Sequence, residues 1–221
     1  MSRRRGWWLH LIVAIVMTSG CATSTTQVEK IRAQAAHERG LAYLNERQPA
    51  SALVALREAV TINPTEPLYR DSLALLLLDL GQIEQALEQL RKALELDPRF
   101  AVGHFHLGVA LAESRRWEDA IKSYQTAIGL PTLTVPDLAH NSLGMALYNL
   151  KRYREAETAL RYAINLDAQF QTAYYNLGLV LVGDGRKAEA KAVFREARKL
   201  GPDSPVGQAA AAQLKDLGEG G

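Results

Sequence analysis

The residues of this sequence that could do chemistry are one cysteine and the histidines. Cys21 is the only cysteine among 221 residues, so no disulfide can form within the chain. Beyond the first twenty residues the histidines are His37, His104, His106 and His140. His104 and His106 are two residues apart, whereas a metal-binding pair on one helix needs a spacing of three or four. No glycine-rich phosphate loop, nucleophile elbow or paired-cysteine motif occurs. The sequence therefore predicts no enzyme, no metal or other cofactor, and no small-molecule substrate.

The composition is that of a globular helical protein. Apolar residues make up 48% of the chain, and aromatic residues only 7%. Abundant alanine and leucine favour an all-α fold. The formal charge is +2, from 26 basic and 24 acidic residues, which gives no field for tracking phosphates and predicts no binding of nucleic acid. Residues 1–20 hold three arginines and no acidic residue, so residues 21–221 carry a formal charge of −1.

The first twenty residues have the pattern of an export signal. Arg3, Arg4 and Arg5 precede an apolar run over 7–17, which is about half of the roughly 20 residues that a membrane-spanning helix needs. A basic start, a short apolar run and small residues after it predict a cleaved signal peptide over 1–20.

Cys21 ends this segment in a distinctive sequence, Thr18-Ser19-Gly20-Cys21. It resembles the lipobox of bacterial lipoproteins. The resemblance implies that a diacylglycerol is attached to the sulfur of Cys21, and that the new amino terminus is acylated, for example by palmitate. Ala22 rather than aspartate follows, which by the family's sorting rule implies a lipid anchor in the outer membrane, facing the periplasm. The alternative is an uncleaved signal anchor in which Cys21 is incidental. Residues 21–32 are expected to form the lipidated cysteine and a polar tether.

The rest of the chain is built from a repeat. Its first marker recurs at intervals of 34, 34, 36 and 34 residues, at Gly40, Ala74, Gly108, Gly144 and Gly178. Two alanine series follow at fixed offsets, one from Ala52 to Ala190 and one from Ala59 to Ala197. This period and these small residues resemble the tetratricopeptide repeat, abbreviated TPR. The resemblance implies a right-handed superhelical solenoid of five helix-turn-helix repeats, in which the small residues let two antiparallel helices approach closely.

The repeat boundaries follow from this register. The five repeats are expected over 33–66, 67–100, 101–136, 137–170 and 171–204, with turns between the paired helices over 46–48, 80–82, 115–117, 151–153 and 184–186. Leucines and aromatic residues at helical spacing supply the buried stripe. Residues 205–221 are expected to form a capping helix, over Ala209 to Leu217, and a tail, because the last repeat of a solenoid needs a polar cover.

The TPR resemblance also implies a binding groove. In that family the first helices line a concave surface, with ligands meeting positions 2, 5, 6, 9, 12 and 13 of each repeat; we call these the groove positions. The predicted partner-binding residues are apolar for the most part: His37, Leu41, Asp71, Leu75, Phe105, Val109, Asn141, Met145, Tyr148, Tyr175 and Leu179. Such a floor suits a helix or strand held by hydrophobic contacts. The alternative is that part of it packs against neighbouring helices of the same chain.

One interval is two residues longer than the others. The extra residues lie in a loop over 129–136, between Pro131 and Pro136. This junction, the lipobox and the array of repeats together resemble the type IV pilus biogenesis lipoproteins, pilotins of the PilF, PilW and Tgl type. The resemblance implies a protein that binds a secretin subunit and promotes its localisation to, or multimerisation in, the outer membrane. The alternative function is a scaffold lipoprotein that recruits peptidoglycan enzymes or another envelope export complex.

Overall fold

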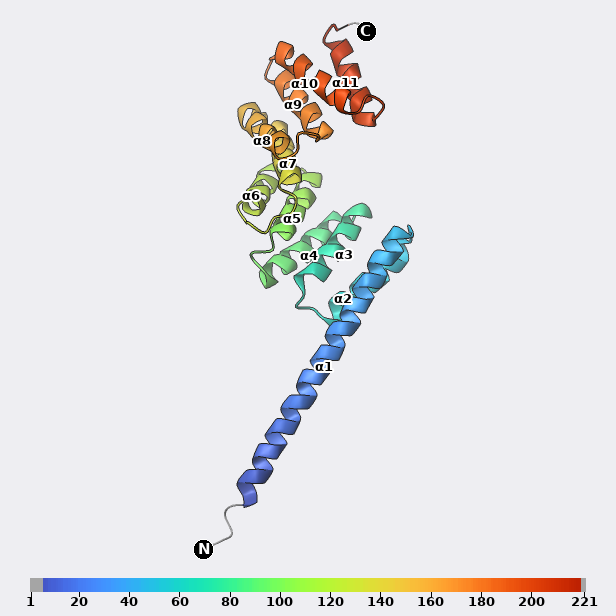
Figure 1. Cartoon of the computed structure of the whole chain (residues 1–221), viewed down its shortest axis with the longest axis vertical. Helices are drawn as coiled ribbons and strands as arrows, with labels where there is room; N and C mark the ends of the chain where they lie inside the picture. Colours follow the sequence, from blue (N-terminus) through green and yellow to red (C-terminus); the bar gives the residue numbers. More distant parts are fainter. Residues whose placement is uncertain (1–5, 220–221) are drawn as a thin grey trace.

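Short turns join eleven helices in the part of the chain that the structure describes, where no strand occurs. The computed structural model describes the backbone of residues 6–219 and the side chains of residues 26–219. Ten helices form successive pairs that stack into a curved array, and an eleventh follows them (Figure 1). The prediction of an all-α array of five helix-turn-helix repeats plus a C-terminal helix is confirmed.

The helix bounds follow the 34-residue period. The first helices of the repeats are α1 (Gly6–Asn45), α3 (Pro67–Asp79), α5 (Ala101–Glu113), α7 (Pro136–Asn149) and α9 (Gln171–Gly183). The second helices are α2 (Pro49–Ile62), α4 (Ile83–Leu96), α6 (Trp117–Ile128), α8 (Tyr153–Leu166) and α10 (Lys187–Leu200), and α11 (Pro205–Asp216) follows.

All five turns within the pairs have the same register. They span 46–48, 80–82, 114–116, 150–152 and 184–186. The predictions that Trp117 and Tyr153 belong to turns are wrong, because each begins a helix. The middle residue of every turn has a positive φ, including the non-glycine residues Arg47, Arg115 and Lys151. This left-handed residue sets the reversal of the chain, and the next helix begins two residues after it.

Small residues of the first helix face large residues of the second. A Cβ atom added to Gly108 would lie 2.5 Å from the ring of Tyr124, and one added to Gly178 would lie 2.3 Å from the ring of Phe194. Ala52, Ala59 and their equivalents in the four later repeats are all fully buried. The close approach that the small residues were expected to permit is therefore present in each pair.

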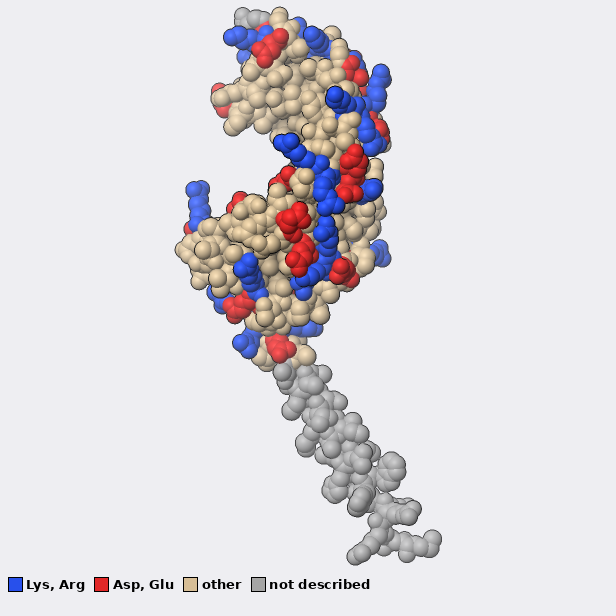
Figure 2. Space-filling model, turned by 180° about the vertical axis from the view of Figure 1, so that it is seen from behind, with Lys and Arg blue, Asp and Glu red and all other residues tan. Residues whose placement is uncertain are grey.

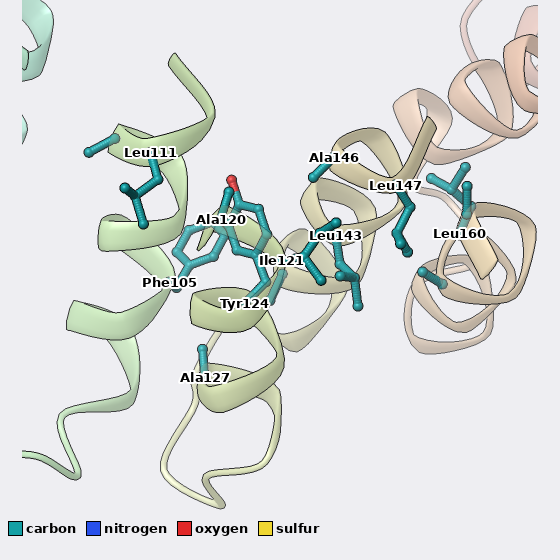
Figure 3. Packing of buried hydrophobic residues seen from close by; sticks show 14 of the residues in the cluster. Phe105, Leu111, Ala120, Ile121, Tyr124, Ala127, Leu143, Ala146, Leu147 and Leu160 are labelled. Atoms are coloured by element: carbon teal, nitrogen blue, oxygen red, sulfur yellow. The ribbon is translucent and has the colours of Figure 1, made fainter. Parts of the chain in front are cut away.

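Successive repeats share one continuous core. Figure 3 shows Ile121 of α6 beside Leu143 of α7, across the junction that holds the two extra residues. Leu133 and Val135 of the 129–136 loop are half-buried against the same core. The longer junction thus keeps repeats three and four packed together.

The C-terminal helix starts earlier than predicted. α11 begins at Pro205 rather than Ala209, because the Ser204 hydroxyl accepts a hydrogen bond of 2.9 Å from the Gly207 amide and caps the helix. Its apolar residues Ala210 and Leu214 are buried against the last repeat. α11 therefore covers the end of the array.

At the other end, α1 projects well beyond the array (Figure 1). The segment expected as a tether, residues 21–32, is part of this helix, and its side chains from Thr26 to Arg32 are exposed. Within the described residues we find no helix with the length and apolar character that crossing a membrane requires. Arg3, Arg4, Arg5 and the side chain of Cys21 lie outside what the structure describes, so the signal-peptide and lipidation predictions remain predictions.

Candidate functional site: the concave face of the helix array

The first helices of the repeats lie along the inner side of the curved array. Each contacts the first helix of the next repeat, α1 and α3 through His37 and Ser72, whereas successive second helices lie apart as the array curves (Figure 1). Figure 2 shows the molecule hollowed on one side, with a largely uncharged surface there, while Lys, Arg, Asp and Glu gather along the rest of that view. The groove positions occupy one side of each first helix, and the repeat resemblance implies that this side lines the concave face.

Hydrogen bonds between side chains join neighbouring first helices across the floor of the groove. His37 Nε2 is 2.8 Å from Ser72 Oγ, His106 Nδ1 is 2.8 Å from Asp71 Oδ1, and Asn176 Nδ2 donates to Asn141 Oδ1 at 2.9 Å. In each case the side chain at position 5 of one repeat is hydrogen-bonded to the side chain at position 6 of the next. We call these three pairs the polar ladder.

The predicted groove residues divide into three groups by exposure. His37, Asp71 and Phe105 are buried, the last against Tyr124 of its own repeat. Leu41 and Leu75 are each 39% exposed. The remaining six are half-buried: Val109, Asn141, Met145, Tyr148, Tyr175 and Leu179. Several residues at position 5 are therefore used for packing within the chain, whereas the leucines at position 9 leave apolar surface exposed to a partner.

The structure adds groove residues that were not singled out from the sequence. Leu68 and Leu138, at position 2, are 46% and 40% exposed, and they add apolar surface near the start of α3 and α7. The ladder residues Ser72, His106 and Asn176 were also missed. A signal existed for them, since each lies 35 residues after a polar residue with complementary hydrogen-bonding groups.

Burial changes the ionisation of two residues near the floor. Desolvation lowers the pKa of His37, although Glu38 and Glu66 oppose that change. Desolvation likewise raises the pKa of Tyr124, whose ring fills the space left by Gly108. Both residues are therefore held in their neutral forms at neutral pH.

The other histidines have packing roles. His104 Nε2 is 3.0 Å from the carbonyl oxygen of Pro98, and His140 stacks on Tyr162 with ring centroids 5.3 Å apart. Among the residues that the structure describes, no three His, Cys, Asp or Glu side chains are grouped as a metal would require. The geometry of the concave face is suited to contact with another molecule through apolar side chains.

Family models establish the class of protein. Models of the tetratricopeptide repeat match residues 33–66, 72–132 and 141–205, which together are more than half of the chain. The chain belongs to the tetratricopeptide-repeat family, whose fold is a scaffold for protein interactions.

Among proteins of this family, the chain is related to factors of type IV pilus biogenesis. It is 32% identical over 177 residues to the type IV pilus assembly protein PilF of Pseudomonas aeruginosa, a match that covers 74% of this chain and 68% of PilF. The crystal structure of PilW, described as a widely conserved type IV pilus biogenesis factor, has the same fold: the TM-score is 0.70 at 20% identity, over 86% of this chain and 93% of PilW. The chain is also 28% identical over 85 residues, 38% of its length, to the small glutamine-rich tetratricopeptide repeat-containing protein 2 of Mycosarcoma maydis, of which it spans 24%.

Proposed function

We propose that this protein is an outer-membrane lipoprotein of the pilotin type, which binds a subunit of the type IV pilus secretin and promotes its localisation or multimerisation in the outer membrane. The observation that carries the proposal is the 32% identity to PilF over most of both chains. The shared fold with PilW supports it.

The concave face supports the binding part of the proposal. Leu41, Leu68, Leu75 and Leu138 expose apolar surface along one side of the first helices. Exposed apolar side chains on one face of an array are characteristic of protein-binding sites. A secretin segment that covers these leucines would gain the free energy of burying them, about 25 cal/mol for each Å² of apolar surface removed from water.

The anchoring part rests on Cys21. In our proposal this residue carries the diacylglycerol, and α1 connects it to the first repeat. Each buried methylene contributes about 0.8 kcal/mol to membrane binding, so several acyl chains hold a protein stably where one chain does not. The groove would then be kept near the inner surface of the outer membrane, where secretin subunits assemble.

A genetic experiment tests the binding part. Deletion of the gene should remove secretin multimers and surface pili, and expression of the wild-type chain should restore them. A Leu75→Lys chain should fail to restore them, because it places a charge in the groove. Leu96→Lys is the matched control, since Leu96 of α4 is 42% exposed but lies outside the groove positions. Normal secretin multimers in the deletion strain would contradict the proposal, and the scaffold function for another envelope complex would replace it.

A fractionation experiment tests the anchor. The Cys21→Ser chain should leave the outer-membrane fraction, and mass spectrometry of the wild-type protein should show an acylated Cys21 at the amino terminus. An unmodified Cys21 in the mature protein would contradict the lipoprotein proposal.

A further inference from the structure

The charged residues at the groove positions are all acidic. No lysine or arginine stands at positions 2, 5, 6, 9, 12 or 13 of any repeat, although the chain has 26 of them. Four acidic residues stand at these positions: Glu38, Asp71, Asp79 and Glu113. The groove therefore differs from the second helices, where exposed cations alternate with acids and pair with them, as Arg161 does with Glu157 at 2.8 Å.

These charges are concentrated at one end of the groove. Glu38 and Asp79 are exposed, and neither takes part in an ion pair between described residues. Asp71 is buried against His106, and Glu113 shares a surface depression with Arg115. Repeats four and five carry no charge at the groove positions. The acidic residues without an ion pair therefore lie over repeats one and two, Glu113 of repeat three lies beside Arg115, and the groove positions of repeats four and five are neutral.

The floor of the groove favours a helical partner over an extended one. An extended segment needs hydrogen-bond partners for its backbone, which a sheet edge supplies and which this floor can supply only through polar side chains that are not already bonded. Six of the polar residues at positions 5 and 6 are already bonded to one another in the polar ladder. A helix satisfies its own backbone and needs only apolar anchors at helical spacing.

We propose that the groove receives an amphipathic helix of the partner protein, with an apolar stripe that runs along the groove and Lys or Arg residues at the end that lies over repeats one and two. The exposed leucines supply the apolar contacts, and Glu38 and Asp79 supply the attraction for the basic end. This proposal rests on the function proposed above, because it describes the segment that the groove would bind.

Two synthetic helices test the charge preference. Each is about 20 residues long, about 30 Å as a helix, with leucines on one face and four ionisable residues at one end. In one peptide these residues are Lys, and in the other they are Glu. We expect the full-length protein to bind the Lys peptide at least about tenfold more tightly at low salt, with the difference shrinking as salt screens the charges. Equal affinities, or no binding of the Lys peptide, would overturn the proposal.

Charge-removing variants locate the basic end. The double change Glu38→Gln and Asp79→Asn should weaken binding of the Lys peptide by about fivefold, as expected for two exposed ion pairs. Glu84→Gln with Glu95→Gln is the matched control, because both residues are exposed on α4 outside the groove positions. A photoreactive group at the Lys end should crosslink to α1 or α3, and one at the other end to α7 or α9. Crosslinks in the reverse order would overturn the orientation.

The outcomes separate this proposal from the one on which it rests. If the Lys and Glu peptides bind equally while Leu75→Lys still prevents secretin assembly in cells, the charge preference is wrong and the pilotin function stands. If the Lys peptide binds as expected while deletion of the gene leaves secretin multimers intact, the groove has the proposed chemistry and serves another partner.

Discussion

At the scale of single residues, each helix pair depends on a small residue opposite a large one. Gly178 faces Phe194, whereas the equivalent pair in repeat two is Ala74 and Leu90, with both residues fully buried. An added methyl at Gly178 would lie 2.3 Å from the ring of Phe194, which is fully buried. We expect Gly178→Ala to lower the free energy of unfolding by about 1–3 kcal/mol, measured by urea denaturation.

A second substitution should compensate for the first. In a Phe194→Leu background, Gly178→Ala reproduces the Ala–Leu pair of repeat two, so its additional cost should largely disappear. Gly129→Ala is the control, since a Cβ there would approach no atom closer than 3.4 Å. An equal cost of Gly178→Ala in both backgrounds would show that steric contact with Phe194 is not the cause.

The same scale shows what the sequence could and could not predict at the groove. The positions of the small residues were predictable, because close helix contact leaves no choice of side-chain size at that place. The burial of His37, Asp71 and Phe105 was not, because it depends on how closely consecutive first helices approach through the curvature of the array. Leu41 and Leu75, one turn farther along, escape this contact and stay exposed.

At the scale of elements, the turn within each pair is defined by backbone conformation rather than by glycine. Gly81 has φ 71° and an added Cβ would meet no atom within 4 Å, so Gly81→Ala isolates the conformational cost. We expect it to lower stability by about 1 kcal/mol. Arg115→Gly, at φ 58° in the equivalent turn, should be neutral or slightly stabilising, because relief of strain offsets the entropy that glycine adds to the unfolded chain. The thermal unfolding temperatures of both variants test these two expectations. A clear loss of stability in Arg115→Gly would contradict the second.

Helix pairs were therefore easier to predict than their ends. The period fixed where each pair lies, and the turn at Arg47 was predicted correctly without a glycine, but the turns at Arg115 and Lys151 were placed one residue too late. The start of α11 depends on the Ser204 cap, which a search for alanine-rich sequence overlooks. The helical conformation of residues 21–32 follows from good helix formers next to the first repeat, although serine and threonine precede them.

Histidines that link or support elements should make stability depend on pH. Burial lowers the pKa values of His37, in the polar ladder, and His140, stacked on Tyr162. The unfolded chain therefore binds protons more readily, and the free energy of unfolding should be highest above the unfolded pKa of 6.5 and fall as the pH drops below it. Urea denaturation between about pH 7.5 and about pH 5 measures this slope. In the double variant His37→Gln and His140→Gln the free energy of unfolding should change less with pH. An unchanged dependence would show that other titratable groups cause it.

At the scale of the whole molecule, an array of repeats must prevent its two ends from stacking on other copies. α11 covers the C-terminal end. At the N-terminal end, position 7 carries Arg39, where repeats two to five carry a leucine that packs toward the preceding repeat. Arg39 is paired with Glu58 of α2, and it shares a surface depression with Val54, which is 68% exposed. The ion pair thus places charge on a face that would otherwise resemble an inter-repeat surface.

This arrangement predicts that removing the charge makes the chain self-associate. Arg39→Leu restores the leucine of the later repeats and leaves Val54 beside it, so the end face becomes apolar. We expect sedimentation velocity to show dimers or larger species at concentrations where the wild-type chain is monomeric. Arg91→Leu, which makes the same change at an exposed position of α4, should remain monomeric. If Arg39→Leu also stays monomeric, the N-terminal face is kept apart by something other than this ion pair, and the projecting part of α1 is the element to change next.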